Sequence, residues 1–213
     1  CCNVTSVHKY IMIKFKNSQD VQISGAEIGL GYRQCAFDIY LNLLDQFNSS
    51  DLLLLESLGP GSIDSKTSLI GINPVLNIEV VDLSVEISGN EVLLKKIQLI
   101  YKNELLVERS PCTLSYLLKN RNSVWDFLRL LDIELKTVEG GVLAFTAFGY
   151  STIHYIEDIV GYVKGDMPDI GLTCYSNYIE CADDRVRLHE YEFIGSEVVS
   201  FSRLRACLTM REE

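Results

Sequence analysis

Two short apolar segments between Asp51 and Pro74 carry polar side chains at their ends. A run of four leucines stops abruptly at Glu56 and Ser57, and a second apolar segment over 68–72 begins with Ser68. A short apolar run closed by turn-forming residues predicts a buried strand. If the two segments pair as neighbouring strands, Ser57 and Ser68 line one pocket, with Glu56 beside them as an acceptor. The pattern therefore predicts a place where a small polar ligand is held against apolar walls.

Other chemistries fit the residues less well. Ser65, Lys66 and Thr67 look like the end of a phosphate-binding loop, but that motif needs glycines where this chain has Ser65 and Pro60. Proline also lacks the N–H that would bind phosphate. The Gly29-Leu30-Gly31 segment lacks the third glycine of a dinucleotide fingerprint, and we interpret it as a turn.

Nucleophilic and metal-assisted catalysis lack their signatures. No G-x-S-x-G elbow is present, and no residue near Ser57 in sequence could act as its base. The three histidines, His8, His154 and His189, are isolated, with no second ligand at metal-binding spacing. We therefore expect packing roles for the histidines, and no catalytic residue, metal or cofactor in this chain.

The segment LLLES, followed eleven residues later by S-L-I-G-I-N-P, resembles the N-terminal domain of component I of anthranilate synthase and its aminodeoxychorismate synthase relatives. In that family the two segments line a tryptophan pocket. The resemblance implies a ligand site made of Leu55, Glu56, Ser57, Lys66, Thr67 and Ser68. Thr67 stands where the family has Tyr or Lys, and Lys66 comes just before it.

A second stretch resembles the family motif G-G-x-x-G-Y-x-x-Y-D-x-x-R-Y-x-E, which is followed by Pro-Asp and a strand. The matching residues here are Gly140, Gly141, Gly149, Tyr150, Tyr155, Glu157, Pro168 and Asp169. Two positions depart from the pattern: Ser151 replaces an aspartate and His154 replaces a basic residue.

Composition limits the class of protein. A chain of 213 residues can bury a full core, and its formal charge of −10 argues against nucleic-acid binding, which needs Lys and Arg on phosphates. No apolar run approaches the ~20 residues of a membrane span, and the N-terminus lacks a signal-peptide layout. We therefore expect a cytoplasmic protein that binds no membrane. The seven cysteines form no C-x-x-C pair, which indicates reduced core thiols.

Periodicity predicts an α+β fold of largely antiparallel sheet with packed helices, and no domain boundary over 1–213. The resemblance implies the N-terminal half of the α/β/β/α sandwich of component I. In the first half of the chain we expect strands within 8–23, a helix from Cys35 to Phe47 with Phe37, Tyr40, Leu41, Leu44 and Phe47 on one face, strands at 52–55, 68–72 and 76–80, a hairpin over 84–94 and a strand over 97–108. Helices should follow at 112–119 and 123–134, the second capped by Ser123 and with Trp125 packed. The rest should form a strand at 140–145 leading into a helix by 157, strands at 171–181 and 186–191, and a final helix over 198–210.

The resemblance also implies a function. Component I enzymes are lyases of tryptophan biosynthesis whose chorismate and Mg²⁺ sit in a C-terminal domain, and the motifs of that domain do not occur in this chain. We expect a regulatory and structural domain, inactive alone, that holds tryptophan or a similar amino acid as a feedback ligand. It would pack on the chorismate-binding domain, with a glutamine amidotransferase as a further partner. The alternatives are the aminodeoxychorismate synthase branch of folate synthesis and a non-catalytic scaffold module.

Overall fold

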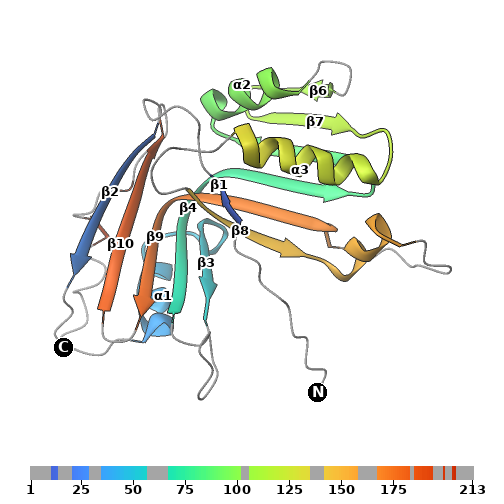
Figure 1. Cartoon of the computed structure of the whole chain (residues 1–213). Helices are drawn as coiled ribbons and strands as arrows, with labels where there is room; N and C mark the ends of the chain where they lie inside the picture. The colour runs from blue at the N-terminus through green and yellow to red at the C-terminus, as the bar shows by residue number, and fades with distance from the viewer. Residues whose placement is uncertain are drawn as a thin grey trace. The chain divides into compact units, whose positions relative to one another are not determined.

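The computed structural model describes residues 11–13, 21–28, 35–56, 67–101, 106–134, 142–157, 167–182, 185–193, 199 and 203–204. The chain folds into two compact units, Cys1–Ser18 with Val75–Cys174 (unit 1) and Gln19–Pro74 with Tyr175–Glu213 (unit 2). Both boundaries fall inside long strands, β4 (Thr67–Val81) and β9 (Ile170–Ala182), so each of these strands contributes one segment to each unit (Figure 1). The single domain over 1–213 stays a prediction.

Unit 1 is a sheet with two helices packed on it. The strand order is β1 (Ile11–Ile13), β8 (Val142–Phe148), β9, β4, β5 (Ser84–Gly89), β7 (Thr113–Leu117) and β6 (Leu106–Arg109). The pairs β1–β8, β8–β9, β4–β5, β5–β7 and β6–β7 are antiparallel. Helices α2 (Glu91–Ile100) and α3 (Asn122–Glu134) contact each other, and α2 packs on β5 and β7 (Figure 1).

The core of unit 1 follows from period-two burial in the strands and from the apolar stripes of the helices. Buried strand residues alternate with exposed ones, as at Val85 and Ile87 on β5. An aromatic cluster joins the two helices, because the Tyr101 ring stacks on Phe127 at 4.0 Å and its hydroxyl donates to the Phe127 carbonyl at 2.8 Å. Burial raises the pKa of Tyr101, so this phenol stays a neutral hydrogen-bond donor.

Unit 2 has a sheet with a helix on one face. Its elements are β2 (Val21–Ile28), α1 (Ala36–Leu44), the 3₁₀ helix η1 (Ser49–Asp51), β3 (Leu52–Leu55), the first part of β4, the second part of β9, and β10 (Arg185–Phe193). β3 pairs with β4, and β10 lies between β9 and β2, all antiparallel. The core cluster contains Ile39, Leu43, Leu52, Ile70, Ile72, Ile179, Val186, Leu188 and Leu204. A mostly antiparallel sheet with few helices agrees with the predicted α+β class.

Several predicted elements are confirmed. Helix α1 begins at Ala36, where the Cys35 thiol caps it by accepting the Asp38 N–H at 3.4 Å. Of the predicted face, Tyr40, Leu44 and Phe47 pack against the core partly buried. Phe37 is exposed, and the fully buried residues are Ile39 and Leu43. Helix α3 is also confirmed, but Asn120 rather than Ser123 caps it, accepting the Ser123 N–H at 3.0 Å.

Trp125 packs as expected. Its indole N–H donates to the Tyr155 carbonyl at 3.4 Å, and its ring meets that of Tyr155 edge-on. The predicted strand before Gly149 is β8, and the predicted helix after it is the 3₁₀ helix η4 (Tyr150–Tyr155). The strands expected at 171–181 and 186–191 are β9 and β10. Within the predicted final helix over 198–210, the structure describes Val199, Arg203 and Leu204. Arg203 and Leu204 are helical and Val199 is not.

The hairpin predicted over 84–94 and the strand predicted over 97–108 are confirmed only at their outer ends, as β5 (84–89) and as the part of β6 that begins at Leu106, and are wrong between them. After β5 the chain forms helix α2, which ends at Ile100. Asn90, which lies within the predicted hairpin, is the helix N-cap, and its side chain accepts the N–H groups of Val92 and Leu93 at 2.8 and 3.4 Å. The helix then buries Leu93, Leu94 and Ile97 against the sheet, so tertiary burial favours helical spacing over alternation.

The helix predicted at 112–119 is also wrong, because Thr113–Leu117 forms strand β7 with Leu114 and Tyr116 buried in alternation. The hairpin that does form joins β4 to β5, with Val81 opposite Ser84. Asp82 in this two-residue connection has φ +54°, a left-handed conformation that aspartate tolerates better than most residues. The sequence around Asp82 lacks glycine, and we did not predict this turn.

The backbone of Asp169 links three parts of unit 1. Its N–H donates to the Val80 carbonyl of β4 at 2.8 Å. Its carbonyl accepts the Gly149 N–H at 2.8 Å and the Thr152 hydroxyl of η4 at 2.7 Å. Because Asp169 directly precedes β9, these bonds fasten the start of β9 to β4 and to η4.

The side chain of Asp169 is buried and accepts two further hydrogen bonds. Oδ2 lies 2.8 Å from the Asp82 N–H and 2.6 Å from the Tyr155 hydroxyl. That hydroxyl is also 2.6 Å from the Asp82 carbonyl, and with one proton it donates to one acceptor at a time. Because burying Oδ2 without these donors would cost free energy, Asp169, Asp82 and Tyr155 act as a unit.

We expect Tyr155→Phe to lower the free energy of unfolding by about 1.5–3 kcal/mol, the range for a hydrogen bond to a charged group. The matched control is Tyr150→Phe, since Tyr150 is 92% exposed at the start of the same 3₁₀ helix. This control should change stability by less than about 0.5 kcal/mol. Urea unfolding of both variants measures the difference. Equal stabilities would contradict the role given to the Tyr155 hydroxyl.

A second prediction concerns Gly71 in β4. A Cβ at this position would lie 2.7–2.9 Å from three ring atoms of the buried Tyr175, whereas a Cβ at Gly171 in β9 would meet nothing within 4 Å. Gly71→Ala should therefore cost about 1–3 kcal/mol through overpacking. Gly171→Ala should stay within about 0.5 kcal/mol of the parent chain. Thermal unfolding of the pair compares them, and an undisturbed Gly71→Ala variant would contradict the close packing.

Candidate functional site

The end of the β3–β4 pair carries the described part of the predicted ligand site. Leu52 lies opposite Ile72, and Leu55 lies opposite Leu69, so the prediction that these segments are neighbouring strands is confirmed. Glu56 follows Leu55 and Ser68 precedes Leu69, which makes them neighbours at this end of the pair. We call this group the hairpin-end site. Of its predicted residues, Leu55, Glu56, Thr67 and Ser68 are described, and each is half-buried. Ser57 and Lys66 lie outside the described residues.

Strand geometry separates the site residues onto two faces. Leu54, Ile70 and Ile72 pack in the core cluster that also contains α1 residues. Ser68 has the same parity as Ile70, so it lies on the α1 face of β4. Thr67 directly precedes Ser68 in the strand, so its side chain lies on the opposite face. One ligand can thus meet the side chain of Ser68 or that of Thr67 within this strand, and it cannot meet both from one side.

Polar residues also join β4 to β9, near the other end of the β3–β4 pair. The Asn73 amide donates to the Ser176 hydroxyl at 3.0 Å, and that hydroxyl donates to the Asn177 side chain at 2.9 Å. The Asn177 amide then donates to the Val199 carbonyl at 3.2 Å. Asn73, just before Pro74 in β4, has φ +59°, a left-handed conformation in which asparagine is enriched. Sequence reasoning missed this chain of bonds, for which the only signal was an Asn-Pro pair and a polar Ser176-Asn177 pair inside a strand pattern.

A second polar group lies on β9 and β10. His189 stacks on Tyr178, with ring centroids 4.2 Å apart, and its Nε2 lies 3.3 Å from a Glu180 carboxylate oxygen. Burial lowers the pKa of His189, and the hydrogen bond and charge of Glu180 oppose this shift without cancelling it. His189 is therefore neutral at pH 7 and packs with its neighbours, as expected for an isolated histidine. Arg187 lies 3.9 Å from the same carboxylate group.

Thiol and metal chemistry find little support in the described residues. Cys35, Cys112, Cys174 and Cys181 are free thiols. Burial raises the pKa of Cys174 to about 12 and that of Cys181 to about 11, so both stay protonated at neutral pH and are poor nucleophiles. Within the described ranges, no three His, Cys, Asp or Glu side chains converge as metal ligands would. These side chains supply hydrogen bonds and packing.

The lowered pKa of His189 predicts a pH dependence of stability. Because the unfolded chain binds the proton more readily, the free energy of unfolding should fall as the pH drops below about 6.5 and level off below the folded-state pKa. His189→Gln should make the free energy of unfolding depend less on pH in this range. Glu180→Gln removes the group that raises the pKa and should deepen the loss. Urea unfolding between pH 5 and 8 tests both variants, and an unchanged slope in His189→Gln would refute the assignment.

This chain was compared with protein-family models and with curated proteins. No family model matches this chain, and no curated protein matches it. In the part of the chain that the structure describes, no helix has the length and apolar character needed to cross a membrane. The hairpin-end site and its neighbours must therefore be interpreted from their own chemistry and from the resemblance of the sequence motifs.

Proposed function

We propose that this chain is a non-catalytic domain of the anthranilate synthase component I type, and that its hairpin-end site holds tryptophan or a similar amino acid. The observation that carries the proposal is the antiparallel pairing of β3 with β4, in which Leu55 lies opposite Leu69. The resemblance needs LLLES and SLIGI to be neighbours, although they are eleven residues apart in the sequence. Their pairing supports that requirement.

The second resembling stretch gives independent support. Gly149 lies against Pro168 and Asp169, and a Cβ at Gly149 would come within 3.0 Å of the Pro168 carbonyl oxygen. The Gly149 N–H bonds to the Asp169 carbonyl, and Tyr155 bonds to the Asp169 carboxylate. The motif residues on either side of the 158–166 segment thus contact one another, which explains why glycine, tyrosine and Pro-Asp would occur together in one motif.

The chemistry of the site suits a zwitterion. Glu56 is an acceptor-only carboxylate that would take the ligand's ammonium group in a charge-assisted hydrogen bond. Ser68 can donate to a ligand carboxylate or accept from its ammonium. Leu55 pairs with Leu69, so it lies on the Thr67 face of the pair and has a structural role, while Ser57 and Lys66 are proposed as further polar contacts. Thr67 lies on the other face of β4, and we give it a structural role.

The proposed role is binding rather than turnover. Under the resemblance, chorismate, Mg²⁺ and the lyase chemistry belong to a separate chorismate-binding domain, against which this chain would pack. An amidotransferase subunit would supply ammonia to that domain. Within the described residues, no carboxylate cluster fits a metal ion, so we assign no metal to this chain. A cytoplasmic location follows from this pathway role and is part of the proposal.

One observation favours a second candidate, a scaffold module that has kept the fold and lost the ligand. Thr67 and Ser68 lie on opposite faces of β4, so the strand offers a ligand fewer polar groups than the motif suggests. The aminodeoxychorismate synthase branch, with tryptophan as a structural ligand, has the same site residues. Ligand titration separates the scaffold from both binding candidates.

Calorimetric titration with L-tryptophan tests the proposal. Ser68→Ala should weaken binding by a factor of roughly 5–150, equivalent to about 1–3 kcal/mol for a lost hydrogen bond to a buried polar group. Ser84→Ala is the control, since Ser84 is an exposed strand serine in β5. Glu56→Gln should weaken both tryptophan and tryptamine, which shares the ammonium group. No heat from millimolar tryptophan would favour the scaffold.

A further inference from the structure

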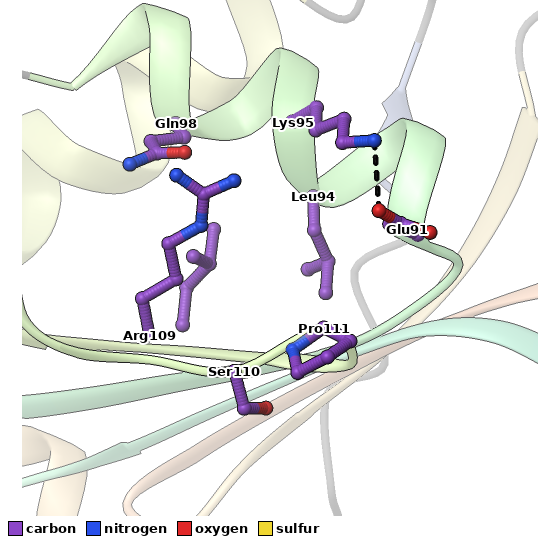
Figure 2. Close-up of a pocket in the computed structure, with 8 residues that line it drawn as sticks. Glu91, Leu94, Lys95, Gln98, Arg109, Ser110 and Pro111 are labelled. Atoms are coloured by element: carbon purple, nitrogen blue, oxygen red, sulfur yellow. Dashed lines mark ion pairs between the residues drawn. The ribbon is translucent and has the colours of Figure 1, made fainter.

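A pocket of about 260 Å³ opens between helix α2 and the β6–β7 hairpin of unit 1. It is lined by Glu91, Leu94, Lys95, Gln98, Arg109, Ser110, Pro111 and Leu114 (Figure 2). We call it the α2–β7 pocket. It shares no residue with the hairpin-end site, and the proposed function does not use it. Its volume is below the roughly 300–1,000 Å³ typical of drug-sized ligands, so it suits a small molecule.

The inner wall of this pocket is apolar and rigid. Leu94 of α2 and Leu114 of β7 are almost fully buried in the unit 1 core, and Pro111 lies just before β7. Figure 2 shows Leu94 pointing down from α2 toward Pro111. Because these side chains are held by the core or by a ring, the surface they offer is formed before any ligand arrives.

The rim carries more positive than negative charge. Lys95 pairs with Glu91 at 2.7 Å, one turn apart on α2, and this contact lowers the pKa of Glu91. Arg109 reaches up from β6 toward Gln98 (Figure 2), and within the described residues no carboxylate lies at ion-pair distance from it. One guanidinium group with five donors is thus available over an apolar wall, in a chain of net charge −10.

Two neutral groups complete the rim. The Ser110 hydroxyl accepts the Cys112 N–H at 3.3 Å, which leaves its own proton to donate. Gln98 offers an amide beside the Arg109 guanidinium. The excess of donors favours an anion, while the Glu91 carboxylate disfavours a second negative charge on the ligand.

We propose that the α2–β7 pocket binds a small monocarboxylate with an aromatic or branched aliphatic body. The carboxylate would accept two parallel N–H bonds from Arg109. The apolar body would lie on Leu94, Pro111 and Leu114. Dianions such as phosphate lack the apolar body and meet repulsion from Glu91, so the pocket selects against them.

Titration of the whole chain with benzoate, followed by ¹H–¹⁵N NMR, tests this site. Benzoate should shift the amide signals of Leu94, Gln98 and Ser110 and should reach saturation at millimolar concentration. Benzyl alcohol keeps the ring without the charge, and inorganic phosphate keeps the charge without the ring. Each should bind at least about tenfold more weakly than benzoate. No saturable shift with benzoate, or equal binding of phosphate, would overturn the proposal.

Three variants locate the binding. Arg109→Gln should weaken benzoate at least about tenfold, and because Arg109 is exposed its melting temperature should be unchanged. Arg129→Gln is the matched control, since Arg129 pairs with Asp126 on the exposed side of α3. Glu91→Gln removes the repelling carboxylate, frees Lys95 and should strengthen benzoate several-fold. Undiminished benzoate affinity in Arg109→Gln would overturn the proposal.

The two binding proposals fail separately. Ser68→Ala should leave benzoate binding at the α2–β7 pocket unchanged, whereas Arg109→Gln should leave tryptophan binding at the hairpin-end site unchanged. Loss of benzoate binding in Ser68→Ala would show that the monocarboxylate occupies the hairpin-end site and would overturn the α2–β7 assignment.

Discussion

Unit 1 depends on the hydrogen bonds of one buried residue, Asp169. A buried polar side chain costs free energy unless it is hydrogen-bonded, and the groups that bond Asp169 Oδ2 come from distant parts of the sequence. The Asp82 N–H and the Tyr155 hydroxyl reach its side chain, while Val80, Gly149 and Thr152 bond its backbone. Satisfying Asp169 therefore sets the β4–β5 turn, the course of η4 and the start of β9 together. Asp169 alone thereby connects the β4–β5 turn, η4 and β9.

Unit 2 uses neutral polar groups for the same purpose. Asn73, Ser176 and Asn177 bond in series between β4 and β9, close to the point where β4 departs from regular strand geometry at Asn73. These bonds hold the strand that carries Ser68 and Gly71. The Tyr175 ring fills the space that a side chain at Gly71 would need. A ligand at the hairpin end would thus meet a strand whose position is fixed by packing on one side and by hydrogen bonds along its length.

Burial sets the protonation state of several described side chains. The buried thiols are held protonated, His189 is held neutral by burial, and the phenol of Tyr101 is kept as a donor by the aromatic cluster around it. Such groups stabilise a fold and do not exchange protons near neutral pH. By contrast, Glu56 and Arg109 stand at the ends or edges of strands, where a ligand could neutralise them. The two proposed sites would bind ligand groups of opposite charge, an ammonium group at Glu56 and a carboxylate at Arg109.

The amino-acid pattern alone determined the α+β class, the positions of α1, α3, β8, β9 and β10, and the pairing of β3 with β4, because apolar periodicity and the turn after Ser57 are local signals. It also named the residues of the hairpin-end site, through motif resemblance. Tertiary structure decided the rest. The segment 91–100 is a helix because Asn90 caps it and the sheet buries Leu93 and Ile97. Asn73 adopts a left-handed conformation within β4 and bonds Ser176 of β9, and the turn at Asp82 is held by Asp169, which accepts the Asp82 N–H. The α2–β7 pocket likewise forms only when α2 packs beside β6 and β7. Each of these outcomes depends on a partner far away in the sequence, and periodicity within one segment carries no information about such partners.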